Sequence, residues 1–189
     1  MTDHHPPSVP GRLHRSVVMV GMMGSGKTAV GRALAQRLGV PFVDSDAEIE
    51  LAAQATIAEI FARDGEAFFR DREAEVIARL LAGPAGILST GGGAWLAERN
   101  RVAVGRLGVS VWLDAPLALL WDRVRHKDTR PLLRTADPRG TLASLHAARV
   151  PFYRLADLRI DVKPDNSIDQ TTAQVIAALA TRPDILELA

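Results

Sequence analysis

Short apolar runs recur along this chain, and longer stretches with helical spacing of apolar residues separate them. The runs lie at 17–20, 40–43, 86–90, 109–113 and 158–162. Runs of this length, rich in Val, Ile and Leu, are typical of buried strands. Strands that alternate with helices favour an α/β fold built on a parallel sheet.

The segments between the runs carry helical patterns. Val30, Leu34 and Leu38 fall on one face, and Gly39 is placed to end that helix. A further helix carries Ile49. The remaining helices are expected at 56–81, with a break near Asp64–Gly65, and at 117–125, 142–153 and 168–180.

The apolar pattern is weak at both ends of the chain and near residue 130. Residues 1–14 hold three Pro and three His, which predicts a disordered tail. We expect a single domain over 15–181 and a C-terminal tail at 182–189. The polar and basic stretch at about 126–140 is expected to be a mobile lid, and a solvated basic loop is the competing interpretation.

Composition limits the classes of function. The chain has 189 residues, 47 % of them hydrophobic, which is enough for one domain with a substantial core. Its net charge of +1 argues against nucleic-acid and membrane-surface partners. The absence of Cys excludes disulfides, thiolate zinc sites and cysteine nucleophiles. No apolar run approaches 18 residues, so a cytoplasmic protein is expected.

The segment Gly21–Thr28 reads G-x-x-x-x-G-K-T, between the first strand and the first helix. This is the phosphate-binding P-loop pattern. Its glycines allow a tight turn whose N–H groups surround a polyphosphate, and the helix N-terminus adds a favourable dipole. Lys27 would reach the β- and γ-phosphates, and the Thr28 hydroxyl would ligate Mg²⁺. A glycine-rich turn that matches by accident is the alternative.

Three further candidates follow strands. Asp44 and Asp46 lie at the end of the second strand, where alternation would turn both toward the phosphate site; capping of the next helix by Ser45 or Asp46 is an equal alternative. Gly91–Gly93 indicates a close approach to the backbone, or a flexible loop. Asp114 is a candidate metal ligand, although its place before Pro116 favours a turn or cap.

In chain order, five motifs together resemble those of the shikimate kinase family. They are the P-loop; Asp44-Ser45-Asp46; Phe69-Arg70 with Glu73; Thr90-Gly91-Gly92-Gly93; and Arg130-Pro131-Leu132-Leu133 followed by Arg149-x-Pro151-x-Tyr153. The resemblance runs from residue 17 to about residue 179. The P-loop alone indicates a superfamily, whereas none of the other four motifs is required for nucleotide binding.

The resemblance implies a role for each matching residue. The implied catalytic residues are Lys27, Asp46 and Arg130. The implied ATP-binding residues are Gly24, Ser25, Gly26, Lys27, Thr28, Ala29, Arg123 and Arg130. The implied shikimate-binding residues are Asp46, Arg70, Gly91, Gly92, Gly93 and Arg149. The implied metal site consists of Thr28, with Asp44 acting through water.

The implied fold is a three-layer P-loop kinase with a five-stranded parallel sheet in the order 2-3-1-4-5 and helices on both faces. The implied activity is ATP-dependent phosphorylation of the 3-hydroxyl of shikimate with Mg²⁺, by an enzyme that we expect to be a monomer. Shikimate carries a carboxylate, which suits paired arginines, and hydroxyls, which suit an aspartate. The alternatives are a related kinase for gluconate or a nucleotide, and a non-catalytic ATP-binding protein.

Overall fold

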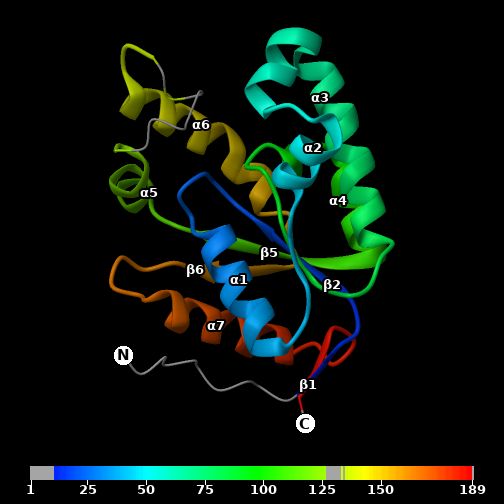
Figure 1. The fold of residues 1–189 in the computed structure, drawn as a ribbon. Helices are drawn as coiled ribbons and strands as arrows, with labels where there is room; N and C mark the ends of the chain where they lie inside the picture. The colour runs from blue at the N-terminus through cyan, green and yellow to red at the C-terminus, as the bar shows by residue number, and fades with distance from the viewer. Residues whose placement is uncertain (1–10, 127–132, 134, 189) are drawn as a thin grey trace, which may run out of the picture.

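The structure, a computed structural model, describes residues 11–126, 133 and 135–188. Five parallel strands form its central sheet in the order β3-β4-β2-β5-β6 (Figure 1). Their bounds are β2 Ser16–Val20, β3 Phe42–Asp44, β4 Ile87–Ser89, β5 Gly108–Asp114 and β6 Leu158–Asp161. Counted within this sheet the order is 2-3-1-4-5, so the predicted fold and strand order are confirmed.

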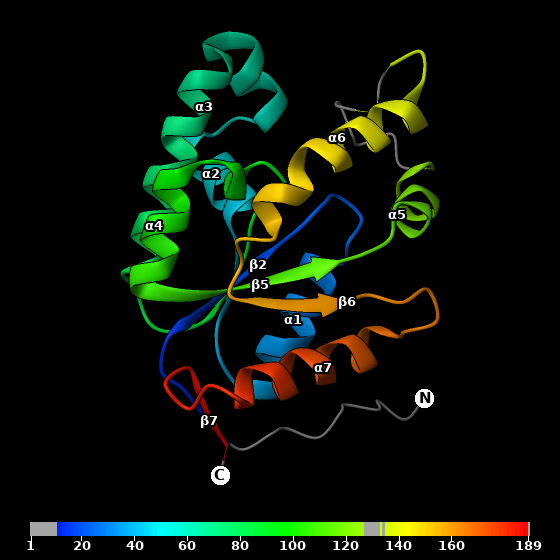
Figure 2. The same ribbon diagram turned by 180° about the vertical axis from the view of Figure 1, so that it is seen from behind.

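Helices cover both faces of the sheet. One face carries α1 (Lys27–Leu38) and α7 (Ile168–Ala180), and the other carries α4 (Glu98–Leu107) and α6 (Pro138–Tyr153) (Figures 1 and 2). The sheet interior is therefore sealed from both sides, and all five residues of β2 are buried. The short helices η1 (Ala94–Leu96) and α5 (Leu117–Val124) follow β4 and β5.

The first helix forms as its sequence predicts. Val30, Leu34 and Leu38 are buried along one side of α1, and the helix ends at Gly39 in the left-handed conformation, with φ of 64°. Trp95 and Trp112 are buried in the core.

A second, smaller apolar cluster lies beside the main core. It joins α2 (Ser45–Ala53) to α3 (Ile57–Leu81) through Ile49, Ile60 and Phe69. Helix α3 begins at a capping box made by Thr56 and Glu59, and it is interrupted at Gly65, where φ is 84° and ψ is 172°. The predicted break near Asp64–Gly65 is confirmed.

The predictions for the chain ends were wrong in part. Strand β1 (Gly11–Leu13) pairs antiparallel with β7 (Leu186–Leu188), so these residues are ordered rather than tails. The physical reason is burial: Leu13 is 9 % exposed and Leu186 is 1 % exposed. Residues 1–10 of the predicted tail lie outside the described residues.

Residues 127–132 and 134 of the predicted lid, which include Lys127, Arg130 and Arg134, also lie outside the described residues. Asp137 caps the N-terminus of α6 by accepting a hydrogen bond from the Gly140 amide. Within the described part of the chain, no helix is both long and apolar enough to cross a membrane.

Candidate active site

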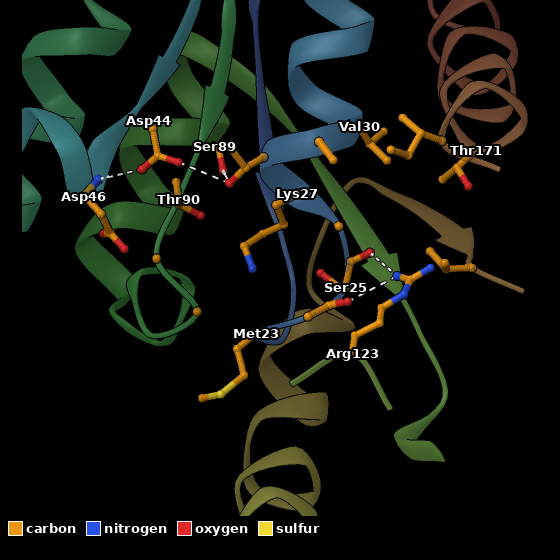
Figure 3. A pocket seen from close by; sticks show the side chains of 18 of the residues that line it. Met23, Ser25, Lys27, Val30, Asp44, Asp46, Ser89, Thr90, Arg123 and Thr171 are labelled. Atoms are coloured by element: carbon orange, nitrogen blue, oxygen red, sulfur yellow. Dashed lines mark hydrogen bonds between the residues drawn. The ribbon is translucent and has the colours of Figure 1, made fainter. Parts of the chain in front are cut away.

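A cavity of about 460 Å³ opens at the carboxyl edge of the sheet. It is lined by the P-loop, by the residues that follow β3 and β4, by α5 and by the segment between β6 and α7. Figure 3 shows Asp44, Asp46 and Lys27 around this space, with Arg123 and Thr171 toward its other end. Ligands of open α/β sheets bind at this edge.

The P-loop occupies the middle of the cavity wall. Its turn requires glycine at position 24, where φ is 81° and a Cβ would lie 2.8 Å from Val124. Helix α1 begins at Lys27, and no side chain among the described residues caps it, so its N-terminus can bind an anion. The Lys27 ammonium donates hydrogen bonds to the Gly21 and Met22 carbonyls, each at 2.9 Å, which holds it over the loop.

Three side-chain oxygens meet beside the P-loop. The Thr28 hydroxyl donates to Asp44 Oδ2 at 3.2 Å and lies 3.3 Å from the Ser89 hydroxyl. The pairing of β3 with β4 sets Asp44 opposite Ser89. Mg²⁺ prefers oxygen ligands and retains several waters, so one carboxylate with two hydroxyls is a donor set that fits it. Sequence reasoning missed Ser89; its place at the end of a central strand was the available signal.

Asp44 reaches the P-loop and also caps a helix. It is the N-cap of α2, in place of the expected Ser45 or Asp46; its Oδ1 accepts from the Asp46 amide at 3.1 Å, and its other oxygen reaches Thr28. The expected alternation of Asp44 and Asp46 along an extended segment was wrong, because α2 begins at Ser45. Both carboxylates nevertheless line the cavity.

Asp46 has an unusual environment for a carboxylate. Its Oδ1 is buried and has no hydrogen-bond partner among the described residues. Burial, followed by the charge of Asp44, raises the pKa of Asp46 to about 6, and Lys27 partly opposes this shift. At neutral pH the group is mainly ionised, yet it is more basic than an ordinary aspartate.

The triple glycine is the meeting point of three charged side chains from three helices. A Cβ at Gly91 would lie 2.7 Å from Asp46 Oδ1, and one at Gly93 would lie 2.6 Å from Arg70 Nη2. A Cβ at Gly92 would lie 3.3 Å from Arg149 Nη1. Of the two interpretations of this segment, close approach to the backbone is therefore correct.

The two arginines lie next to Gly92 and Gly93 and are not among the residues that line the cavity. Arg70 pairs with Glu73 at 2.9 Å, and Glu73 is 1 % exposed. The guanidinium carbon of Arg70 also lies 5.1 Å from the centre of the Phe69 ring. Burial raises the pKa of Glu73, while the charge of Arg70 opposes that shift. Arg149, on α6, is 8 % exposed.

The other end of the cavity suits a nucleoside. Arg123 Nη1 donates to the Gly24 carbonyl at 3.1 Å, and burial lowers the pKa of Arg123. The facing wall comes from the segment after β6 and from the first turn of α7, through Val162, Asn166, Ser167, Ile168 and Thr171. Sequence reasoning missed this wall, because its residue types carry no recognisable pattern.

Asp114 is not a ligand of this site. It pairs with Arg159 at 2.9 Å and does not line the main cavity. This agrees with the structural role that the sequence favoured over metal binding. The described residues contain no cluster of three His, Cys, Asp or Glu that could hold a metal, so the hydroxyl-rich site beside the P-loop is the better metal candidate.

A P-loop, an adjoining set of oxygen donors and a glycine loop approached by three charged side chains are the features of a P-loop phosphotransferase. The family model described as shikimate kinase matches residues 23–180. A shikimate kinase from Ruegeria pomeroyi is 70 % identical over 176 residues, covering 93 % of this chain and 90 % of that protein. One from Cereibacter sphaeroides is 61 % identical over 179 residues, covering 95 % and 89 %.

Solved structures agree. A shikimate kinase from Acinetobacter baumannii in complex with shikimate superimposes with a TM-score of 0.80 at 39 % identity, covering 88 % of this chain and 93 % of that chain. A gluconokinase from Sinorhizobium meliloti, at 20 % identity and a TM-score of 0.59, shares the fold alone. The chain belongs to the shikimate kinase family, and it is an ATP-dependent kinase of that family.

Proposed function

We propose that this chain transfers the γ-phosphoryl group of ATP to the 3-hydroxyl of shikimate, giving shikimate 3-phosphate and ADP. The observation that carries the proposal is the convergence of Asp46, Arg70 and Arg149 on Gly91–Gly93, next to the P-loop. One carboxylate and two guanidinium groups match an acceptor that has hydroxyls and a carboxylate.

The arginines orient the acceptor. Arg70 and Arg149 bind its carboxylate, because planar guanidinium groups form paired hydrogen bonds with carboxylates. The buried Glu73 holds Arg70 in place at 2.9 Å. The hydroxyl to be phosphorylated then faces Asp46, at the boundary with the P-loop.

Asp46 prepares the attacking hydroxyl. Its carboxylate accepts the hydrogen bond that the hydroxyl donates and so aims the oxygen at the γ-phosphate. With a pKa of about 6, it can also take the proton as the new bond forms. The supports for this role are its unpartnered Oδ1 and its place at the cavity wall.

The P-loop side supplies positive charge. Lys27 exchanges its carbonyl partners for the β- and γ-phosphates, which the amides at the start of α1 also bind. Thr28 and Asp44, with Ser89 beside them, would hold Mg²⁺, which supplies charge to the phosphate oxygens. Arg123 and the segment after β6 hold the adenosine end. Arg130, outside the described residues, is proposed to reach the transferring phosphate from the lid.

The test compares shikimate with an analogue in which an uncharged amide replaces the carboxylate, in a coupled assay of ADP release. The native enzyme should prefer the acid by about 10- to 150-fold, because a charge-assisted contact is worth roughly 1.5–3 kcal/mol. In Arg149→Ala most of that preference should disappear, while the KM for ATP stays unchanged. Equal use of acid and amide by the native enzyme would overturn the proposal and return attention to another acceptor.

A further inference from the structure

Two side-chain hydrogen bonds join the end of α6 to the glycine loop and to the short helix that follows it. The Tyr153 hydroxyl donates to the Gly92 carbonyl at 2.6 Å. The Trp95 indole N–H donates to the Phe152 carbonyl at 3.0 Å. Tyr153 is 0 % exposed and Trp95 is 4 % exposed, so both donors are buried. Hydrogen bonds from buried donors favour one geometry, because breaking either bond leaves a buried polar group unpaired.

The first bond lies directly beside Arg149. Arg149 precedes Tyr153 by four residues on α6, so the two side chains share one face of the helix. The same glycine therefore meets both side chains, since a Cβ at Gly92 would lie 3.3 Å from Arg149 Nη1. The phenol and the guanidinium therefore both lie against Gly92.

The last turn of α6 needs such support. Pro151 lies inside the helix between Arg149 and Tyr153, and proline donates no backbone hydrogen bond. The Tyr153 ring also stacks on Trp112 of β5, with ring centres 6.1 Å apart, and its hydroxyl lies 3.8 Å from the Met22 sulfur. The ring itself cannot easily move, so the hydroxyl is a fixed donor.

We propose that Tyr153 and Trp95 are positioning residues for acceptor recognition. Together they lock the glycine loop against the helix that carries Arg149, and thereby set the affinity and the carboxylate preference of the site. This inference rests on the proposed role of Arg149 in binding the acceptor carboxylate. It assigns no contact with substrate to either aromatic residue.

The main test is Tyr153→Phe, which keeps the ring and its packing but removes the donor. The KM for shikimate should rise about 3- to 12-fold, in line with one lost hydrogen bond, and the preference for acid over amide should fall by a similar factor. The KM for ATP should not change. Trp95→Phe should shift the same two quantities in the same direction.

Ser110→Ala is the matched control. Ser110 is 0 % exposed and its hydroxyl donates to Asp157 at 2.6 Å, in β5 and away from the glycine loop. Like Tyr153→Phe, the Ser110→Ala variant loses a hydrogen bond from a buried hydroxyl. Its melting temperature should therefore fall, while the KM for shikimate and the acid-to-amide preference stay native. A Tyr153→Phe enzyme that behaves like this control, losing only thermal stability, would reduce Tyr153 to a packing residue.

A double variant separates positioning through Arg149 from an independent effect. In an Arg149→Ala background, Tyr153→Phe should change the KM for shikimate by less than twofold, because the group that it positions is gone. A full additive loss would show that the hydroxyl does not act through Arg149. If the native enzyme fails to distinguish acid from amide, the proposed function itself fails. If the native enzyme prefers the acid, and Tyr153→Phe keeps that preference in full, only this inference fails.

Discussion

The burial of Asp46 makes its carboxylate more basic and lowers the free energy of unfolding at neutral pH. Its buried Oδ1 lacks a partner in the described structure, and burial together with Asp44 raises its pKa from 3.8 to about 6. A carboxyl whose folded pKa exceeds the unfolded value keeps its proton more tightly in the folded state. The contribution of Asp46 to the free energy of unfolding is therefore most favourable below pH 3.8, and it is lost as the pH rises through about 6.

Asp46→Asn removes the charge and keeps the size of the side chain, so it measures the effect of this charge on the free energy of unfolding. At pH 7.5 the variant should be more stable than the native protein by about 1–3 kcal/mol, whereas near pH 4 the difference should vanish. Urea unfolding at the two pH values measures this. The same gain at both pH values would mean that the charge of Asp46 is not the source of the cost.

The same substitution tests the role of Asp46 in turnover. Turnover should fall by orders of magnitude in Asp46→Asn, because the amide is a weak acceptor for the attacking hydroxyl. In the native enzyme kcat/KM for shikimate should decline below about pH 6, following the free-enzyme pKa of Asp46. An acid limb near pH 4 would show that Asp46 titrates as an ordinary aspartate.

Single residues also mark the limit of what the sequence could predict about the site. The motif around Lys27 and Thr28 identified the phosphate end, because its spacing is rarely matched by chance. Ser89 was missed because a serine at a strand end has no distinctive neighbours. Its role follows from register, which sets it opposite Asp44.

Among the elements, the loop Gly91–Gly93 organises the acceptor pocket. The sequence indicated that something approaches this backbone, but it could not show that the approaching groups come from α2, α3 and α6. That convergence depends on packing between segments far apart in the chain. Sequence periodicity does not encode it.

Gly93→Ala tests this loop, because Gly93 has φ of −94° and ψ of −17°, which alanine adopts without strain. The only cost is steric: the new Cβ would lie 2.6 Å from Arg70 Nη2, so the guanidinium must move. The KM for shikimate should rise at least tenfold, as for loss of a charge-assisted contact, with the KM for ATP unchanged. Steady-state kinetics with each substrate varied in turn measures both.

Gly105→Ala is the control for this substitution. Gly105 lies inside α4, and a Cβ there would meet no described atom within 4 Å. Both KM values should stay native, and the protein should gain about 0.5–1 kcal/mol, since alanine favours a helix over glycine. A native KM for shikimate in Gly93→Ala would show that Arg70 tolerates displacement and does not read the acceptor.

At the scale of the whole molecule, the sequence predicted the sheet and its order but not the joining of the two chain ends. The strands of the sheet are buried runs with clear patterns, and the family resemblance supplied their order. Strands β1 and β7 have three residues each and pair across almost the full length of the chain. Such short segments show no periodicity, so only the burial of Leu13, Ile185 and Leu186 reveals them.

The last prediction concerns this terminal pairing. Leu186 is 1 % exposed in the core, whereas Leu188, two residues further along the same strand, is 43 % exposed. Leu186→Ala should cost about 2–4 kcal/mol through lost burial and the cavity left behind, and Leu188→Ala should stay within about 0.5 kcal/mol. Urea unfolding measures both free energies. The KM values for ATP and shikimate should remain native in each variant, because β7 lies at the opposite end of the molecule from the residues after β5 and β6 (Figure 2). Equal and small losses of unfolding free energy in the two variants would mean that the β1–β7 pair does not stabilise the fold. A changed KM would mean that the chain ends influence the site.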